Sequence, residues 1–330
     1  MPRPVKLKEL VSRLCGPGSD YRAAKRMTSE KFLGVPVRGR YIKLTKQPLE
    51  LIANLVGIGV AEKRTNRKSV GLPAITFYVK EKLPKSRLTR RLLLPKTIAG
   101  LTCDVVACGA VKPAQGGSPS DPLDPVTPGA QIQVEGAEPG TLGGFVTDAD
   151  GEECLISNCH VLSADLATGE GASVFQPAFG FPGSRRIATV KTVVSISANG
   201  RNRVDVALAR MDSGIRTDHP IPGIGAITGT GRPSPGRSVA KYGQTTENTD
   251  GQFDSMDTDV VVSFGFSSAL FARVYVFRPG SFAGAGDSGS LVVEPGSGTV
   301  VGIIFATSAL LNFAIPAEAV EDEVGPLTWL

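Results

Sequence analysis

The residues that could perform chemistry are few, and the histidines are the most informative. Only His160 and His219 occur in 330 residues, and imidazole is the side chain that exchanges protons most readily near neutral pH. His219 lies in RTDHPIPG, a turn sequence that predicts a surface position. His160 lies in LISNCHVLS, at the end of an apolar run typical of a strand. His160 is therefore the candidate base.

An acid and a nucleophile follow His160 along the chain. Asp205 lies within the apolar stretch VDVALA, where a buried carboxylate needs a hydrogen-bond donor and an imidazole N–H is a natural one. Ser288 lies in GAGDSGSLVV. Its neighbours Gly286 and Gly289 predict a tight turn whose backbone N–H groups can point at one spot. The order His, Asp, Ser is one of three known orders of the acyl-transfer triad.

The motifs around these residues are similar to those of a known family. SNCHVL, DVALA and GDSGS resemble the histidine, aspartate and serine motifs of the trypsin/chymotrypsin-like serine peptidases, in that family's order and spacing. Lys241–Phe253 also resembles a connecting hairpin of bacterial members. The resemblance covers about residues 140–320, and residues 48–110 more loosely resemble the N-terminal module of some bacterial members.

The resemblance implies a fold and a reaction. The fold is a chymotrypsin-like double antiparallel β-barrel, with His160 and Asp205 in the first barrel and Ser288 in the second. Ser288 would attack a peptide carbonyl, His160 would carry the proton, and Asp205 would orient the imidazole. The backbone N–H groups of Gly286 and Ser288 would form the oxyanion hole. The protein would be a serine endopeptidase that needs no cofactor and no metal.

The substrate pocket is less well defined by these motifs. By the same resemblance, Phe282, Phe305, Ala306 and Thr307 should line the primary pocket. Phe282 replaces the acidic residue with which trypsin-like members bind Lys or Arg. We therefore expect a small or apolar substrate side chain.

Some family features are missing. Cys159 precedes His160, so the disulfide of secreted members is not reproduced. Phe305 stands where many relatives have a Ser that supports the catalytic Asp. No IVGG-type new N-terminus is evident, which leaves the partner of Asp287 open.

The elements that must position these residues are mostly strands. Short apolar runs such as Cys154–Ile156, Ile187–Val194, Val204–Ala209 and Val300–Phe305 alternate with turn signals after residue 130, which is typical of a barrel or sandwich. Before residue 130, the sequence predicts a small α+β domain. Its elements are a helical stretch at Lys6–Leu14, a basic stretch at Ser86–Leu94 for which a helix is one interpretation, and strands at Leu51–Val60, Ala74–Val79 and Leu101–Cys108.

Charge and composition predict three parts. Residues 1–125 hold 24 Lys or Arg and 9 Asp or Glu, whereas residues 126–330 hold 12 and 22. Five prolines fall within residues 112–130, which is typical of a linker. We therefore predict a basic accessory or regulatory module over 1–111, a linker over 112–130 and the peptidase over 131–330.

Alternative interpretations remain open. The chain could be a catalytically silent peptide-binding scaffold, or a protease triggered by nucleic acid on the clusters Lys63–Lys68 and Arg87–Arg91. Docking of the basic module onto the acidic peptidase or a regulatory partner is favoured over both nucleic acid and a membrane surface. The GxGxxG match at Gly284–Gly289 opens no predicted helix and is set aside. The absence of a signal-like or membrane-spanning stretch predicts a cytoplasmic, bacterial-type protein.

Overall fold

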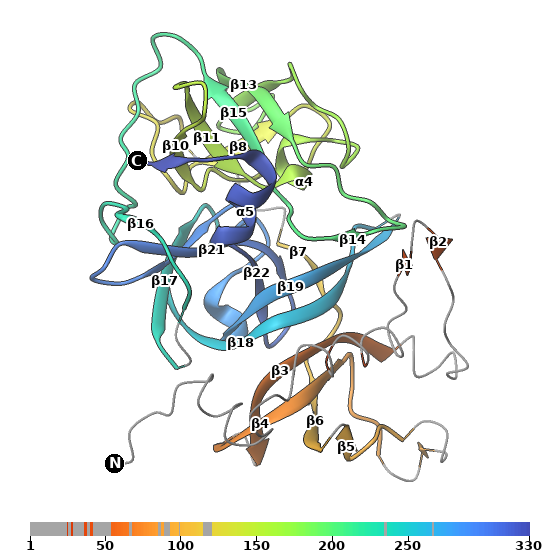
Figure 1. Cartoon of the computed structure of the whole chain (residues 1–330). Helices are drawn as coiled ribbons and strands as arrows, with labels where there is room; N and C mark the ends of the chain where they lie inside the picture. Colours follow the sequence, from red (N-terminus) through yellow and green to blue (C-terminus); the bar gives the residue numbers. More distant parts are fainter. Residues whose placement is uncertain are drawn as a thin grey trace.

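The computed structural model describes residues 54–330 and a few residues before them. It leaves out residues 66–67, 85–86, 89–92, 99, 115–120, 234–235 and 266 of that range, and adds residues 25, 28, 36–37 and 40–41. The predicted helix at Lys6–Leu14 and part of the basic stretch Ser86–Leu94 lie outside the described residues. Strands dominate the rest, which confirms the mostly β prediction (Figure 1). No described helix is long and apolar enough to cross a membrane.

The first half of residues 131–330, together with β23, forms a curled antiparallel sheet with the strand order β23-β10-β11-β15-β13-β12-β8-β9. Its strands are β8 (Gln131–Val134), β9 (Gly140–Thr141), β10 (Gly144–Thr147), β11 (Glu153–Ser157), β12 (Ser173–Gln176), β13 (Arg185–Val193), β15 (Ala207–Met211) and β23 (Thr328–Trp329). Alternate residues such as Phe145, Leu155 and Ile187 are fully buried in its core, as expected for strands with one apolar face. The strand predicted over Val204–Ala209 starts only at Ala207, which leaves Asp205 in the preceding loop.

The second half is a closed barrel. Neighbouring strands run β19-β22-β21-β20-β17-β18, and β18 pairs again with β19. The strands are β17 (Ser238–Gly243), β18 (Glu247–Ser263), β19 (Ser268–Arg278), β20 (Leu291–Glu294), β21 (Thr299–Thr307) and β22 (Asn312–Pro316), with short additions at β14 (Arg201–Asn202) and β16 (Gly229–Thr230). Two curled β structures of this kind agree with the expected chymotrypsin-like double barrel. The β18–β19 pairing closes the second barrel, so its strands have neighbours on both sides.

The basic N-terminal region adds strands to the second barrel. β3 (Leu55–Thr65), β4 (Lys68–Val79), β5 (Thr97–Ile98) and β6 (Leu101–Ala107) continue the sheet beyond β18, while β1 (Pro36–Val37) and β2 (Arg40–Tyr41) pair only with each other. β3 pairs antiparallel with β18, so the orange strands lie beside the blue barrel in Figure 1. Lys25 Nζ lies 2.8 Å from Asp259 Oδ1 and Arg64 Nη2 lies 3.1 Å from Asp254 Oδ1. Part of the basic charge is thus paired with acidic residues of the same chain.

The composition predicted a linker over residues 112–130, and both described ends of this segment pack onto the two β structures that follow it. β7 (Lys112–Pro113) pairs with β21, and Val126 is fully buried in the first core. Backbone groups of β7 are hydrogen-bonded to β21, whereas those of a solvated linker would be hydrogen-bonded to water. The acidic residues 321–323 near the C-terminus lie in helix α5 (Ala317–Val324).

Candidate active site

His160 and Asp205 are brought together by two neighbouring strands of the first sheet. His160 lies in α4 (Cys159–Leu162), the single helical turn that follows β11, and Asp205 lies just before β15. Because Ser157 of β11 is opposite Ala207 of β15, the residues beyond these ends meet at one edge. His160 Nδ1 lies 2.5 Å from Asp205 Oδ2, and the His160 backbone N–H donates to Asp205 Oδ1 at 3.2 Å.

Burial makes this pair well defined. Both side chains are fully shielded from solvent, and the ring of Phe264, between β18 and β19, lies 5.9 Å from the His160 ring. Within the described part of the chain, His160 Nε2 is buried and has no hydrogen-bond partner. A buried ring nitrogen without a partner is costly, so Nε2 is poised to accept a proton from a group that reaches it.

Ser288 lies in the turn between η2 (Gly280–Phe282) and β20. The turn needs its glycines: Gly286 and Gly289 have φ of 107° and 99°, a region that favours glycine. A Cβ on Gly289 would also lie 2.1 Å from the Thr141 carbonyl oxygen. The Ser288 hydroxyl donates to the Phe305 carbonyl at 3.2 Å. No described hydrogen bond joins Ser288 to His160, so the described contacts bring His160 to Asp205 but not to Ser288.

Two backbone N–H groups beside Ser288 converge on one oxygen. The N–H groups of Gly286 and Ser288 donate to the Ala114 carbonyl oxygen at 2.6 and 2.8 Å. Thr141 supports the turn, because its hydroxyl donates to the Gly286 carbonyl at 2.8 Å. These donors are already directed to a single point, which is the arrangement that stabilises an oxyanion.

Asp287 lies between the two donor residues, and its side chain stabilises the turn. Its carboxylate accepts hydrogen bonds from the backbone N–H groups of Gly284, Thr245 and Thr246 at 2.8 to 3.2 Å. Lys241 Nζ lies 3.2 Å from Asp287 Oδ2, and both side chains are completely buried. Burial lowers the pKa of the Lys241 ammonium, and the Asp287 carboxylate opposes that shift. The partner of Asp287 is therefore an internal lysine rather than a chain terminus.

The residues predicted to line the pocket belong to two different apolar clusters of the second barrel. Phe282 lies in one cluster, and Phe305 and Ala306 lie in the other. Phe282 is fully buried in the apolar cluster that also contains Ala114. The Phe305 side chain packs against Phe271, with ring centroids 4.8 Å apart, so Phe305 contributes to the site through its carbonyl. Ala306 and Thr307 contribute backbone, because they pair with Pro113 and Lys112.

Lys241 and Ala114 belong to this site although no sequence motif identifies them. A charged residue in the strand sequence SVAKYG was the available signal for Lys241, since a lysine facing a barrel core needs a buried partner. Ala114 carried no signal, because its role depends only on contacts far along the chain. His219, predicted to be a surface residue, is half-buried, with its Nε2 3.2 Å from Glu153 Oε1.

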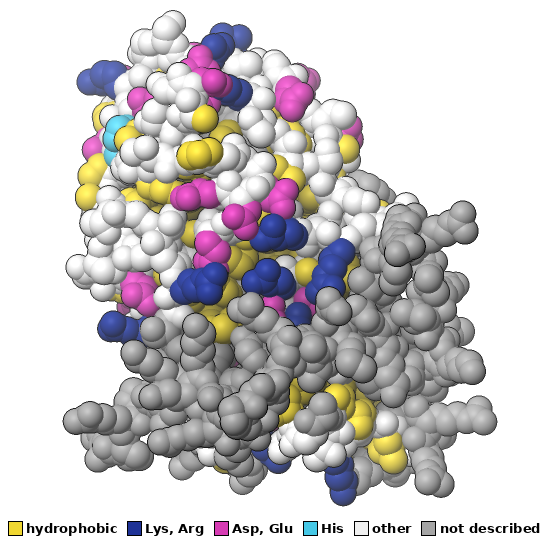
Figure 2. All heavy atoms as spheres, viewed as in Figure 1, with side chains coloured by type: hydrophobic (Ala, Val, Ile, Leu, Met, Phe, Trp, Pro, Cys, Tyr) yellow, Lys and Arg dark blue, Asp and Glu magenta, His cyan; other side chains and the backbone are white. Residues whose placement is uncertain are grey.

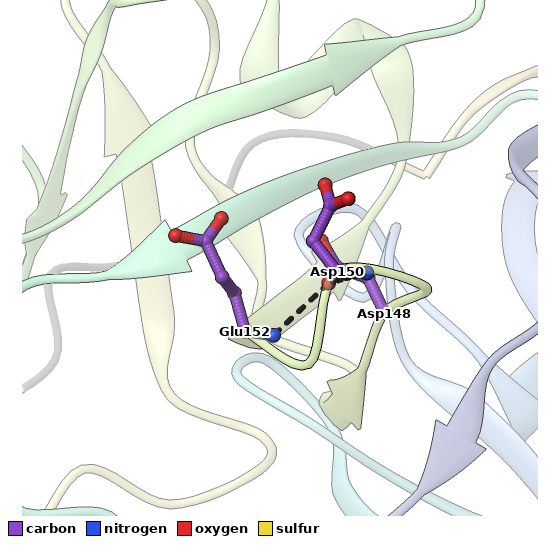
Figure 3. A group of neighbouring side chains, drawn as sticks. All are labelled: Asp148, Asp150 and Glu152. Carbon is purple, nitrogen blue, oxygen red and sulfur yellow. Dashed lines mark hydrogen bonds between the residues drawn. The ribbon is translucent and has the colours of Figure 1, made fainter.

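A group of three carboxylates occurs outside this site. Asp148, Asp150 and Glu152 lie around one hairpin turn, with their carboxylate atoms within 4.8 Å of one another (Figure 3). Lys191 Nζ lies 2.5 to 2.7 Å from an oxygen of each. The lysine ammonium therefore already occupies the position that a cation would take.

Comparison with solved structures found several similar proteins at low sequence identity. Similar solved structures include the Nocardiopsis protease (15% identity, TM-score 0.45, covering 63% of this chain and 99% of that one). They also include Cellulomonas bogoriensis chymotrypsin (16%, 0.43, 63% and 99%) and the MamO protease domain from Magnetospirillum magneticum (18%, 0.35, 59% and 95%). No protein-family model and no curated protein sequence matches the chain. The structural neighbours are thus chymotrypsin-like serine proteases, as the sequence motifs suggested.

Proposed function

We propose that the protein is a serine endopeptidase that uses Ser288, His160 and Asp205. The observation that carries the proposal is the convergence of the Gly286 and Ser288 N–H groups on one carbonyl oxygen, 2.6 and 2.8 Å away, beside a serine hydroxyl. The buried His160–Asp205 pair, 2.5 Å apart, supplies a base of fixed orientation.

The reaction follows from these positions. The Ser288 hydroxyl turns from the Phe305 carbonyl to His160 Nε2 and attacks the substrate carbonyl as Nε2 takes its proton. The substrate oxyanion takes the place of the Ala114 carbonyl oxygen at the N–H groups of Gly286 and Ser288. Each donor stabilises the transition state by about 2.7–4 kcal/mol. Asp205 stabilises the imidazolium, which then protonates the leaving amine.

Reaction with a fluorophosphonate probe tests this proposal. The probe should modify Ser288, and the Ser288→Ala variant should remain unmodified. A folded protein that hydrolyses no peptide or ester and never reacts with the probe would contradict the proposed function.

A silent peptide-binding scaffold is the second candidate. Two observations favour it: the Ser288 hydroxyl donates to Phe305 rather than to His160, and the two N–H groups already hold a carbonyl of the chain itself. A peptide that binds wild type and Ser288→Ala equally and is never cut would support the scaffold. Cleavage of that peptide by wild type alone would exclude it.

The basic N-terminal region is proposed to hold or regulate the peptidase. The β3–β18 pairing and the pairing of Lys25 and Arg64 with carboxylates of β18 support this role. On the face shown in Figure 2, basic side chains also gather directly beside acidic ones. Basic side chains already paired with carboxylates of the chain, such as Lys25 and Arg64, are less available to phosphates, which favours docking between protein surfaces over nucleic acid.

A further inference from the structure

Asn158 is a polar side chain beside the candidate active site whose role the triad does not explain. It has no exposed surface and is the N-cap of α4, the turn that carries His160. An asparagine at an N-cap normally accepts a hydrogen bond, through its side-chain oxygen, from the N–H of the second or third helical residue. The Asn158 side chain makes no such bond, so the amide serves a purpose other than capping.

The capping bond that Asn158 does not make is supplied by Asp205. The N–H of His160, the second helical residue of α4, donates to Asp205 Oδ1 at 3.2 Å. In return, Asn158 Nδ2 donates to the Asp205 backbone carbonyl at 2.7 Å. The turn that carries His160 and the loop that carries Asp205 are thus joined by two reciprocal hydrogen bonds, in addition to the contact between His160 Nδ1 and Asp205 Oδ2.

This arrangement leaves the side-chain oxygen of Asn158 without a partner. Asn158 Oδ1 is buried, and no group in the described part of the chain donates to it. A buried polar atom without a partner costs free energy, and in a native fold it calls for an explanation. An apolar residue, or an amide turned to cap α4, would avoid this cost. The unpaired oxygen is explained if the Nδ2–H group is needed at Asp205.

Asp205 has few other supports. The described hydrogen bonds to Asp205 come from His160 and Asn158. Cys159, which lies between these two residues in the sequence, directs its thiol to the Leu166 carbonyl instead. The carboxylate of Asp205 is therefore held by His160 alone, and the backbone that carries this carboxylate is held by Asn158.

We propose that Asn158 is a positioning residue, whose Nδ2–H group holds the Asp205 backbone where the carboxylate meets His160 Nδ1. This inference rests on the proposed peptidase function. Asn158 touches neither the substrate nor the reacting atoms and acts only through Asp205. Without its hydrogen bond the loop before β15 moves away from α4, and His160 loses its fixed orientation. Misplacement by about 1 Å, caused by a change outside the reacting groups, can cost about 10²-fold in rate.

The test compares two buried amides, Asn158 and Gln176. Gln176 is fully buried in β12, and both ends of its amide have partners, since Nε2 donates to the Asp121 carbonyl and Oε1 accepts the Leu123 N–H, each at 2.9 Å. Asn158→Leu should lower kcat for an ester substrate about 10²-fold with little change in KM. Gln176→Met should keep the wild-type kcat.

Urea unfolding should rank the same two variants in the opposite order. Gln176→Met leaves two backbone groups without their partners, whereas Asn158→Leu leaves one and also removes an unpaired oxygen. The urea midpoint should therefore fall further in Gln176→Met than in Asn158→Leu. An Asn158→Leu variant with unchanged kcat, or one whose loss of kcat merely follows its loss of stability, would overturn the positioning role.

A second variant and a second measurement keep the test independent of leucine packing. Asn158→Asp has the same size, lacks the donor and carries a carboxylate that competes with Asp205 for the His160 N–H, so it should lose at least as much kcat. The chain has only two histidines, so NMR of isotopically labelled histidine, with His219→Asn for assignment, identifies the proton between His160 Nδ1 and Asp205 Oδ2. This resonance should persist in Gln176→Met and be shifted or lost in both Asn158 variants.

Fluorophosphonate labelling of Ser288 in the wild type separates this inference from the proposed function. Labelling together with wild-type kcat in both Asn158 variants would overturn the positioning role and leave the peptidase standing. A wild type that never labels would remove the peptidase, and the NMR resonance would then decide the positioning role. Loss of the resonance in the Asn158 variants would support that role, whereas an unchanged resonance would overturn it.

Discussion

Replacement of Lys241 by Met should destabilise the protein far more than the loss of one ordinary ion pair. The side chains of Lys241 and Asp287 are both fully buried, with Nζ 3.2 Å from Oδ2. Methionine has nearly the same length but no charge, so the Asp287 carboxylate would remain buried without its cation. Removal of one partner of a buried ion pair costs about 3–5 kcal/mol of unfolding free energy. Typical domains have only about 5–15 kcal/mol in total.

The variant should lose activity as well as stability. Asp287 lies between the two residues whose N–H groups form the proposed oxyanion hole. An uncompensated charge at this position should therefore shift both donors. Loss of one such donor lowers kcat by about 10²–10³-fold, and we expect at least that for Lys241→Met.

Urea unfolding of Lys241→Met beside the wild-type protein measures the effect on stability. The matched control is the double variant Lys241→Met/Asp287→Asn, in which no buried charge is left unpaired. The double variant should be more stable than Lys241→Met alone, because it removes the carboxylate charge that Lys241→Met leaves buried and uncompensated. A Lys241→Met variant within about 0.5 kcal/mol of its parent, the size of an ordinary surface substitution, would refute this reasoning.

Three other changes test separate parts of the structure. Asp205→Asn should lower kcat about 10⁴-fold with little change in KM, because the amide no longer holds His160 in the required tautomer; an unchanged kcat in an ester assay would contradict the assignment. Gly289→Ala should lower the thermal unfolding midpoint markedly, because its φ of 99° and the nearby Thr141 carbonyl exclude a Cβ; equal midpoints by circular dichroism would contradict it. The Lys191 ammonium, followed by Arg210, holds the pKa of Glu152 below its usual range, which stabilises the fold above the unfolded pKa and is lost as pH falls through the folded one. Lys191→Met should therefore move acid unfolding to higher pH, as followed by Trp329 fluorescence, and an unchanged midpoint beside Lys191→Arg would exclude this role.

The amino-acid sequence determined which residues could do the chemistry and the general kind of fold. Short apolar runs and closely spaced turn residues are local signals, so they predicted β6, β11 and β21 with small errors at the ends and the second half of β4. The motif GDSGS likewise predicted the tight turn at Ser288, since positive φ at Gly286 and Gly289 is a local property of glycine.

The tertiary structure decided what holds and what fills the site. The pairing of Lys241 with Asp287 and the position of Ala114 beneath Gly286 and Ser288 join segments far apart in the chain, which no local pattern encodes. Proline content predicted a linker at residues 112–130. The first residues of this segment form strand β7 instead, because the edge of β21 supplies hydrogen-bond partners for their backbone groups. The charge difference between the two parts of the chain similarly acquired a structural role only when Lys25 and Arg64 were placed against the carboxylates of β18.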